Sequence, residues 1–329
     1  MKHVGVNVAE DPIFTAAYNG VGGGFVIVSA DDPSMHSSQN EQDNRHYARA
    51  AKLAMVEPSD SQECLDFMRE AYRISEQFDI PVLFRTTTRV AHSKSIVTFG
   101  EREEQEAKPY APANAFLNHP KLEKTLEALE AYGCTSPLNR MELNGTKVGV
   151  ISASIAYEYA KDAFPADTSF LKLGLTNPLP MDLIRSFAEK VEKLYIIEEL
   201  DDFMESQIRA AGIACEGKSL TGKLYELNPQ LLKERIFGRK AETVDVGVYA
   251  VSRPPALCPG CPHRGFFYTM SRHKDFVISG DIGCYTLGGS APLSALDSVV
   301  CMGGGFSIGM GMSKAFELTG QTDRKVFGV

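Results

Sequence analysis

Four cysteines in the last quarter of the chain have the residue type and spacing to bind a metal or to exchange electrons. Cys258 and Cys261 form a C-x-x-C pair, and Cys284 and Cys301 stand alone. A zinc ribbon requires a second close pair, which the sequence lacks. A thioredoxin-like dithiol requires the pair at a helix start, whereas the two prolines and the glycine around this pair predict a stiff, kinked turn. Three interpretations therefore stay open: thiolate ligands, a rigid loop beneath a cofactor, or buried structural thiols.

Two glycine-rich turns in the same region have the composition to hold an anion. The apolar run Phe276–Ser279 leads into Gly280–Tyr285, and the run Val299–Cys301 leads into Met302–Gly305 and a small-residue helix, Phe306–Leu318. Glycines let the backbone approach a ligand closely. Free N–H groups and the positive end of a helix attract negative charge. The pattern predicts an anionic ligand at the carboxyl ends of two strands.

A polar loop follows another predicted strand. Phe25–Ser29 reads as a buried strand, and the residues from Ala30 to Arg45 are rich in Asp, Asn and Ser. Open α/β sheets place their ligands at this position, at the carboxyl ends of strands. A solvated loop with ordinary turn chemistry is the alternative, which composition alone favours.

Four acidic residues between a predicted strand and a predicted helix are a further candidate for acid–base chemistry. They are Glu198, Glu199, Asp201 and Asp202. Paired carboxylates can act as general acid and base. The positive end of a helix also attracts acidic side chains, and we favour this second explanation.

The elements that position these residues follow from hydrophobic periodicity and capping signals. Near the amino end, Ser59 and Gln62 predict a capping box, and Ile80–Thr86 predicts a strand. Strand–helix repetition in the middle of the chain predicts a parallel sheet with right-handed connections. Its predicted strands are Lys147–Ser152, Ser169–Leu173 and Leu194–Glu198, and its predicted helices are Ile155–Phe164, Met181–Lys190 and Phe203–Ala211.

Composition is that of an ordinary globular protein. The 329 residues, 43% of them hydrophobic, suffice for two or three domains. The net charge of −8 argues against a nucleic-acid or membrane-surface role. No apolar run approaches the roughly 18–20 residues of a membrane span, and the first residues lack a signal peptide's apolar core. Seven cysteines without disulfide-scaffold density indicate a reducing cytoplasm.

Three motifs are similar to those of a known family: Val26–Asp43, Cys258–Gly265 and Gly280–Tyr285. They resemble the large (alpha) subunit of indolepyruvate ferredoxin oxidoreductase, a thiamine-diphosphate enzyme of the 2-oxoacid:ferredoxin oxidoreductase superfamily. The resemblance covers essentially the whole chain and implies an α/β fold of three parallel-sheet domains of the thiamine-diphosphate-enzyme type, the first and last incomplete. The resemblance implies three domains. Residues 1–95 would form the C-terminal part of the pyrimidine-binding domain, 141–219 a transketolase C-terminal-like domain, and 250–329 the N-terminal part of the diphosphate-binding domain. Residues 96–140 and 220–249 would be linkers between them.

The resemblance also implies an activity and partners. Members of the family decarboxylate arylpyruvates oxidatively, form an aryl-acetyl-CoA from CoA, and reduce ferredoxin through iron–sulfur clusters. They pair this subunit with a smaller beta subunit. The rival interpretation is a non-catalytic module that binds a metal or an iron–sulfur cluster and only docks partners. Binding of thiamine diphosphate distinguishes the two.

By resemblance, the site residues fall into three groups. The catalytic residues, facing the reactive end of the cofactor, are expected to be Gln39, Asn40, Asp43 and Arg45, and Arg45 is suited to hold a substrate carboxylate by a charged, bidentate contact. The residues that line the cofactor are expected to be Asp281, Ile282, Gly283, Gly303 and Gly304. The ligands of a hypothetical proximal [4Fe-4S] cluster are expected to be Cys258, Cys261 and Cys284.

The chain resembles only a piece of that subunit. The family's segment with the cofactor-activating glutamate, its metal-binding turn and its C-terminal cysteine runs have no counterpart here. No asparagine follows Asn228, so the Mg²⁺ site is expected to be incomplete. A fourth ligand for the proximal cluster would lie beyond Val329. We therefore expect the 329-residue chain by itself to be inactive.

Overall fold

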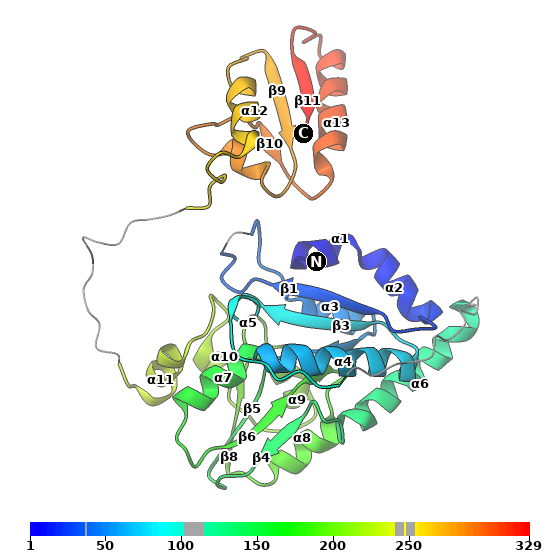
Figure 1. Ribbon diagram of the computed structural model, residues 1–329, viewed down its shortest axis with the longest axis vertical. Coiled ribbons are helices and arrows are strands. Elements are labelled where there is room, and N and C mark those ends of the chain that lie inside the picture. The colour runs from blue at the N-terminus through cyan, green and yellow to red at the C-terminus, as the bar shows by residue number, and fades with distance from the viewer. Residues whose placement is uncertain (37, 102–114, 241–246, 248–253) are drawn as a thin grey trace. The chain divides into compact units, whose positions relative to one another are not determined.

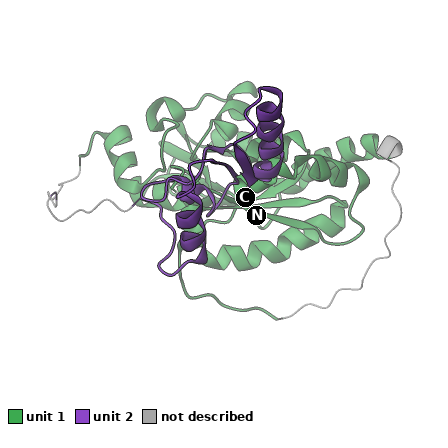
Figure 2. Cartoon of the chain, turned by 90° about the horizontal axis from the view of Figure 1, so that it is seen from above, with its two compact units in different colours: residues 1–243 green, residues 244–329 purple. Residues whose placement is uncertain are grey.

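The computed structural model describes residues 1–36, 38–101, 115–240, 247 and 254–329. The chain forms two compact units, Met1–Thr243 and Val244–Val329, drawn in green and purple in Figure 2. Both units are α/β structures (Figure 1). Their described residues form two four-stranded sheets in the first unit and one three-stranded sheet in the second.

The first sheet of the first unit has the strand order β1-β3-β2-β7. β1 and β2 pair parallel with β3, while β7 pairs antiparallel with β2. Helix α4 (Ser61–Phe78) packs against Val82 and Phe84 of β3, and the alternate residue Leu83 faces the opposite side. The four strands are β1 (Val26–Asp31), β2 (Ala54–Val56), β3 (Val82–Thr87) and β7 (Leu175–Asn177).

The second sheet of the first unit has the order β4-β6-β5-β8. β5 pairs parallel with β6 and β8, which confirms the parallel sheet predicted from the sequence. An antiparallel edge strand, β4, was not predicted. The strands are β4 (Arg140–Glu142), β5 (Val148–Ala153), β6 (Ser169–Leu173) and β8 (Lys193–Ile197).

The remaining helices of the first unit cover these sheets. They are α1 (His3–Val8), α2 (Glu10–Asn19), α3 (Asn44–Ala50), α5 (Thr88–His92), α6 (Ala115–Gly133), α7 (Ser154–Ala163), α8 (Met181–Ala188), α9 (Phe203–Ala210), α10 (Lys218–Thr221) and α11 (Pro229–Phe237). None of the described helices of the chain combines the length and the apolar character that crossing a membrane requires.

One hydrophobic core joins the two sheets. Leu83 of β3 and Ile151 of β5 belong to the same buried cluster, together with Phe187 of α8 and Phe203 of α9. The outer face of the first sheet packs against α4 and α6, and that of the second sheet against α7 and α11. The regions 1–95 and 141–219, for which we predicted separate domains, therefore lie in one compact unit.

The region 96–140 is more than the linker that we predicted. Its residues 115–133 form α6, which contributes Leu122 and Leu129 to the core shared with α4. Most of the charged and proline-rich stretch that suggested a crossing, residues 102–114, lies outside the described residues.

Helix α4 begins with a capping box displaced by one residue from the predicted one. Asp60 is the N-cap, and its carboxylate accepts from the Glu63 N–H at 2.8 Å. In return, Glu63 Oε2 accepts from the Ser59 N–H at 2.8 Å. The prediction from Ser59 and Gln62 was wrong because the overlapping pair Asp60 and Glu63 fits the same capping pattern and supplies a carboxylate at each position.

The chain passes from the second sheet to the first at Gly174, between β6 and β7. The Glu57 N–H donates to the Gly174 carbonyl at 2.8 Å. A Cβ at this position would lie 2.4 Å from the Leu138 carbonyl oxygen and 2.6 Å from the Phe67 ring. This crossing therefore requires glycine.

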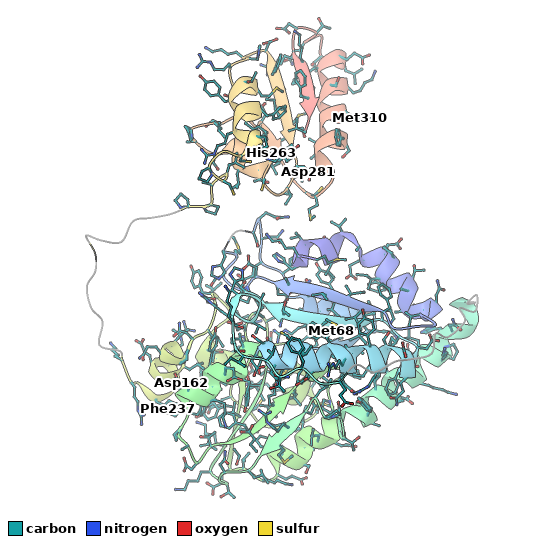
Figure 3. All side chains as sticks on the ribbon, in the orientation of Figure 1. Met68, Asp162, Phe237, His263, Asp281 and Met310 are labelled. Carbon is teal, nitrogen blue, oxygen red and sulfur yellow. The ribbon has the colours of Figure 1, made fainter. Side chains whose placement is uncertain are left out.

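The second unit has a parallel sheet of order β10-β9-β11. α13 packs against β9 and β11, and Met310 lies on the outer side of α13 (Figure 3). A short 3₁₀ turn, η2 (Thr286–Gly289), contacts α12. The elements are α12 (Pro262–Met270), β9 (Phe276–Gly280), β10 (Ser298–Val299), α13 (Gly304–Leu318) and β11 (Lys325–Gly328).

Replacing either of two glycines of α13 by alanine should change the stability of the second unit, in opposite directions. A Cβ at Gly305 would lie 2.6 Å from the Val329 carbonyl oxygen, and this backbone cannot yield cheaply. We expect Gly305→Ala to lower the free energy of unfolding by about 1–3 kcal/mol. Nothing lies within 4 Å of a Cβ at Gly311, so Gly311→Ala should stabilise the helix by about 0.5–1 kcal/mol. Native-state hydrogen exchange of the β9 amides measures both effects, and equal effects would contradict the close packing of α13.

Candidate functional site

The predicted catalytic residues lie in the first unit, on the segment that leads from β1 into α3. Ser34, Met35 and His36 have positive φ angles of 72°, 61° and 24°. Each left-handed non-glycine residue costs about 1–2 kcal/mol, and such strain concentrates at functional sites. Ser38 Oγ donates to Asp32 Oδ2 at 2.6 Å across the loop. The strain favours a functional loop over the solvated-loop alternative.

Two of the four predicted catalytic residues face solvent. Gln39 and Asn40 are exposed. The Asn40 carbonyl lies 3.1 Å from His3 Nε2, and its Oδ1 accepts from Gln42 Nε2 at 2.9 Å. These bonds fix the backbone of the loop and leave the Gln39 side chain in solvent.

Asp43 and Arg45 are instead buried against each other, and Arg45 is only 2% exposed. Arg45 donates to both carboxylate oxygens of Asp43, from Nε at 2.8 Å and from Nη2 at 2.5 Å. Nη1 donates to Glu198 Oε2 at 2.5 Å, and Nη2 also reaches the Glu199 and Asp201 carbonyls. Arg45 therefore ties α3 to the segment after β8. This geometry corrects the role that we predicted for Arg45, because its guanidinium already binds carboxylates of its own chain.

A second buried arginine extends this network. Arg85 of β3 is 3% exposed and donates from Nε to Asp31 Oδ2 at 2.6 Å and from Nη1 to Glu57. We missed Arg85 and its partners, although a charged residue within an otherwise apolar strand signals a buried ion pair. We call the following residues the buried ion cluster: Asp31, Asp43, Arg45, Glu57, Arg85 and Glu198.

Burial shifts the ionisation of groups in and around this cluster. It raises the pKa of Asp31 and of Glu198, in spite of their arginine partners. Burial also acts to raise the pKa of Asp43, but the Arg45 guanidinium outweighs it and holds that pKa well below its usual value. Burial lowers the pKa of Lys218 to about 8. Groups with shifted pKa values occur both in functional sites and in structural ion networks. The hydrogen bonds of Arg45 favour a structural ion network here.

The first two acidic residues after β8, Glu198 and Glu199, accept hydrogen bonds from backbone N–H groups. Glu198 accepts from the N–H groups of Met204 and Glu205, each at 3.0 Å, at the start of α9. Glu199 Oε1 accepts from the Leu227 N–H at 2.9 Å. The bonds of Glu198 favour the helix-dipole explanation over acid–base work for that residue.

In the second unit, the Asp281 carboxylate lies at the point where β9 meets the start of α13 (Figure 3). It accepts from the N–H groups of Ile282 at 2.7 Å, Gly303 at 2.9 Å and Gly305 at 3.3 Å. Burial acts to raise the pKa of Asp281, but these donors outweigh it and lower the pKa below its usual value. The glycine turn thus binds a negative group, and that group belongs to the chain itself.

The other predicted cofactor residues complete these turns. Gly303 is the N-cap of α13 with a left-handed φ of 76°, and Gly283 has a φ of 115°. The Gly304 N–H donates to the Cys301 carbonyl at 3.0 Å. Hydrogen bonds through Asp281 therefore bring Ile282 and Gly303 together, while Gly283 and Gly304 shape the two turns.

The C-x-x-C pair encloses the turn that we expected: Gly260 has a left-handed φ of 74°, and the Cys261 N–H donates to the Cys258 carbonyl at 3.1 Å. The turn leads directly into a helix, which we did not expect. Cys261 is the N-cap of α12, and Pro262 occupies the first turn of the helix. Cys261 Sγ lies 3.1 Å from His263 Nδ1, and the His263 ring packs edge-on against Tyr285. Cys261 is half-buried, whereas the other cysteines of this unit are exposed: Cys258, Cys284 and Cys301. The run Val299–Cys301 predicted a strand that includes Cys301, but β10 ends at Val299.

Among the described residues, three possible ligands come close enough to share one metal ion only at Asp43, His46 and Asp201. Asp43 is already bonded to Arg45, and His46 Nε2 lies 3.1 Å from Asp201 Oδ2 as an exposed pair. Asp43 thus belongs to the buried ion cluster, and His46 and Asp201 lie beside it.

The sequence matches no protein-family model. It is 40% identical to the indolepyruvate oxidoreductase subunit IorA of Archaeoglobus fulgidus, over 95% of this chain and 56% of that protein. The same subunit is 39% identical in Methanothermobacter thermautotrophicus, over 96% of this chain and 57% of that protein. The subunit of Pyrococcus horikoshii is 35% identical, over 99% of this chain and 56% of that protein. The chain thus spans a little more than half the length of these curated relatives.

In structure, the chain is similar to a 2-oxoglutarate:ferredoxin oxidoreductase from Magnetococcus marinus. The TM-score is 0.53 at 11% identity, covering 72% of this chain and 52% of that chain. At this identity the likeness concerns the fold alone. The fold is the α/β type with several parallel sheets that the resemblance implied. By sequence, the chain belongs to the family of indolepyruvate oxidoreductase IorA subunits, which confirms the resemblance seen in its motifs.

Proposed function

We propose that the chain is part of an enzyme that oxidatively decarboxylates an arylpyruvate such as indolepyruvate. The carboxylate leaves as CO₂, CoA takes the remaining acyl group as an aryl-acetyl-CoA, and an electron pair passes to ferredoxin. One observation carries this proposal: the identity of 35–40%, over nearly the whole chain, to subunits named for indolepyruvate oxidation. A smaller beta subunit is the proposed partner.

The glycine turns of the second unit support a binding site for thiamine diphosphate. Thiamine diphosphate supplies the carbanion stabilisation that loss of CO₂ from a 2-oxoacid requires. The N–H groups of Gly303 and Gly305 bond to Asp281, which fixes the shape of the turn at the start of α13. A diphosphate would bind beside this carboxylate, at the positive end of the helix. Asp281 is a positioning residue that holds the end of β9 against this turn. The residues proposed to line the cofactor are Asp281, Ile282, Gly283, Gly303 and Gly304.

Gln39 and Asn40 are the proposed substrate-facing residues, because they are exposed on a strained loop. Mg²⁺ is a further proposal, although the described residues of the second unit place no three ligands within reach of one ion. An iron–sulfur cluster separates its thiolates more widely than a single ion does. Cys258, Cys261 and Cys284 therefore stay the proposed ligands of such a cluster.

The test is an anaerobic assay of the protein encoded by the full reading frame, co-expressed with its beta subunit. We expect indolepyruvate to reduce ferredoxin in the presence of CoA and thiamine diphosphate, faster than 2-oxoglutarate does. Asp281→Ala should weaken activation by thiamine diphosphate at least tenfold. Asp275→Ala is the matched control, because Asp275 is exposed and its nearest cation, Lys325, lies 3.7 Å away.

Two outcomes would contradict the proposal. A complete complex that reduces ferredoxin equally well from every 2-oxoacid would contradict the arylpyruvate substrate. A complete complex that ignores thiamine diphosphate would favour the rival interpretation, a non-catalytic docking module.

A further inference from the structure

A small internal cavity lies beside the buried ion cluster, between the two sheets of the first unit. Its wall includes Glu57, which follows β2, Arg85 and Thr87 of β3, and Ser154, the first residue of α7. The space open to the centre of a water-sized sphere is about 10 Å³. This is roughly the volume that one water molecule requires, and it leaves no room for a second.

Four residues of this wall each carry one polar atom without a hydrogen-bond partner among the described residues. These atoms are Glu57 Oε2, Arg85 Nη2, Thr87 Oγ1 and Ser154 Oγ. Arg85 Nη2 lies 4.0 Å from Asp43 Oδ1, an ion pair too long for a hydrogen bond. The four residues are between 1% and 4% exposed, so bulk water does not reach them. An unpaired buried polar group costs about 1–3 kcal/mol, and native proteins seldom gather several in one place. The cavity therefore needs a polar occupant.

The four atoms differ in chemistry, which restricts the occupant. A cation would face the Arg85 guanidinium, and an anion would face the Glu57 carboxylate. An apolar molecule would satisfy none of the four atoms. Water both donates and accepts hydrogen bonds, and it fits the volume.

We propose that the cavity binds a single water molecule as a permanent part of the first unit. The water accepts from Arg85 Nη2 and donates to Glu57 Oε2. It donates to one of the hydroxyls of Thr87 and Ser154, and the other hydroxyl donates to it. These four bonds lie within the usual range for internal water. They link the first sheet to the start of α7 on the second.

The backbone of Ser154 agrees with this assignment. Ser154 has a left-handed φ of 51°, a conformation that glycine adopts without strain. Serine costs about 1–2 kcal/mol more there than glycine. A hydroxyl that binds the internal water offsets this cost, and glycine has no group to do so.

A high-resolution crystal structure of the full chain tests the proposal directly. We expect one ordered water peak within hydrogen-bond distance of Arg85 Nη2, Glu57 Oε2 and at least one of the two hydroxyls. An empty cavity, or an anomalous peak from an ion, would overturn the proposal.

Two conservative variants test the bound water in solution, by whether they lower or raise the stability of the first unit. If water is bound, Thr87→Val and Ser154→Ala each remove one of its partners, and each should lower the folding equilibrium constant about tenfold. If the cavity is dry, each variant only removes an unpaired buried hydroxyl, and stability should stay equal or rise. Thr98→Val is the control, because Thr98 is exposed in the same unit, and it should change the constant less than threefold.

Discussion

Replacing Arg45 by alanine should lower the free energy of unfolding of the first unit by about 3–5 kcal/mol, because two buried carboxylates lose their partner. Asp43 and Glu198 are both nearly inaccessible to water and bond to the guanidinium at 2.5 Å. Urea unfolding followed by far-UV circular dichroism measures the change. Arg49→Ala on the same helix is the control; Arg49 is exposed, and its replacement should cost less than about 0.5 kcal/mol.

This result separates two roles for Arg45. A residue kept free for a substrate carboxylate can be removed with little change in stability and a large rise in KM. A stability change of Arg45→Ala no larger than that of Arg49→Ala would therefore restore the substrate-binding role. Structural loss is the outcome that the observed bonds predict.

Replacing Lys172 by methionine should destabilise the first unit by a similar amount, about 3–5 kcal/mol. Lys172 of β6 is fully buried and pairs with Glu63 of α4, and its Nζ lies 4.5 Å from the centroid of the Phe67 ring. Burial lowers the pKa of Lys172 in spite of Glu63. Methionine fills the volume but removes the cation that pairs with the Glu63 carboxylate. Among the described residues, the hydrogen bonds to this carboxylate that remain come from the N–H and hydroxyl of Ser59.

A second substitution tests the cause. In Lys172→Met combined with Glu63→Gln, a neutral amide oxygen still accepts from Ser59 and no unpaired charge remains. We expect the double variant to recover most of the lost stability. If the stability losses of the two single variants simply add in the double variant, methionine destabilises the unit through packing and not through the unpaired charge. Lys190→Met, at an exposed position just after α8, controls for the loss of a lysine.

The fold was largely predictable because its strands and helices carry strong local patterns. Ser169–Leu173 has the same bounds in prediction and structure, since three of its five residues are large and apolar and residues typical of turns flank it. The strands β2 and β7 were missed. Each is three residues long, and their pairing joins Met55 to Asn177, far apart in the sequence. β2 also pairs with β3, but β7 pairs only with β2 among the described strands. No local signal marks strands this short.

The sequence could point to residues of the candidate site but could not reveal what they contact. The motif after β1 correctly drew attention to Asp43 and Arg45, but Glu198, which bonds to Arg45, lies 153 positions away. Whether an arginine awaits a ligand or binds its own chain depends on that distant carboxylate. The start of α12, by contrast, could have been predicted from Pro262, because proline is favoured in the first turn of a helix.

The pairing of β7 with β2 limits how this protein can be dissected. A fragment that ends before Leu175 would keep β2 but leave its outer N–H and C=O groups without a partner strand. Open edges of this kind pair with other molecules and promote aggregation. A fragment that carries the polar loop and remains monodisperse should therefore extend at least through Asn177, which brings most of the second sheet with it.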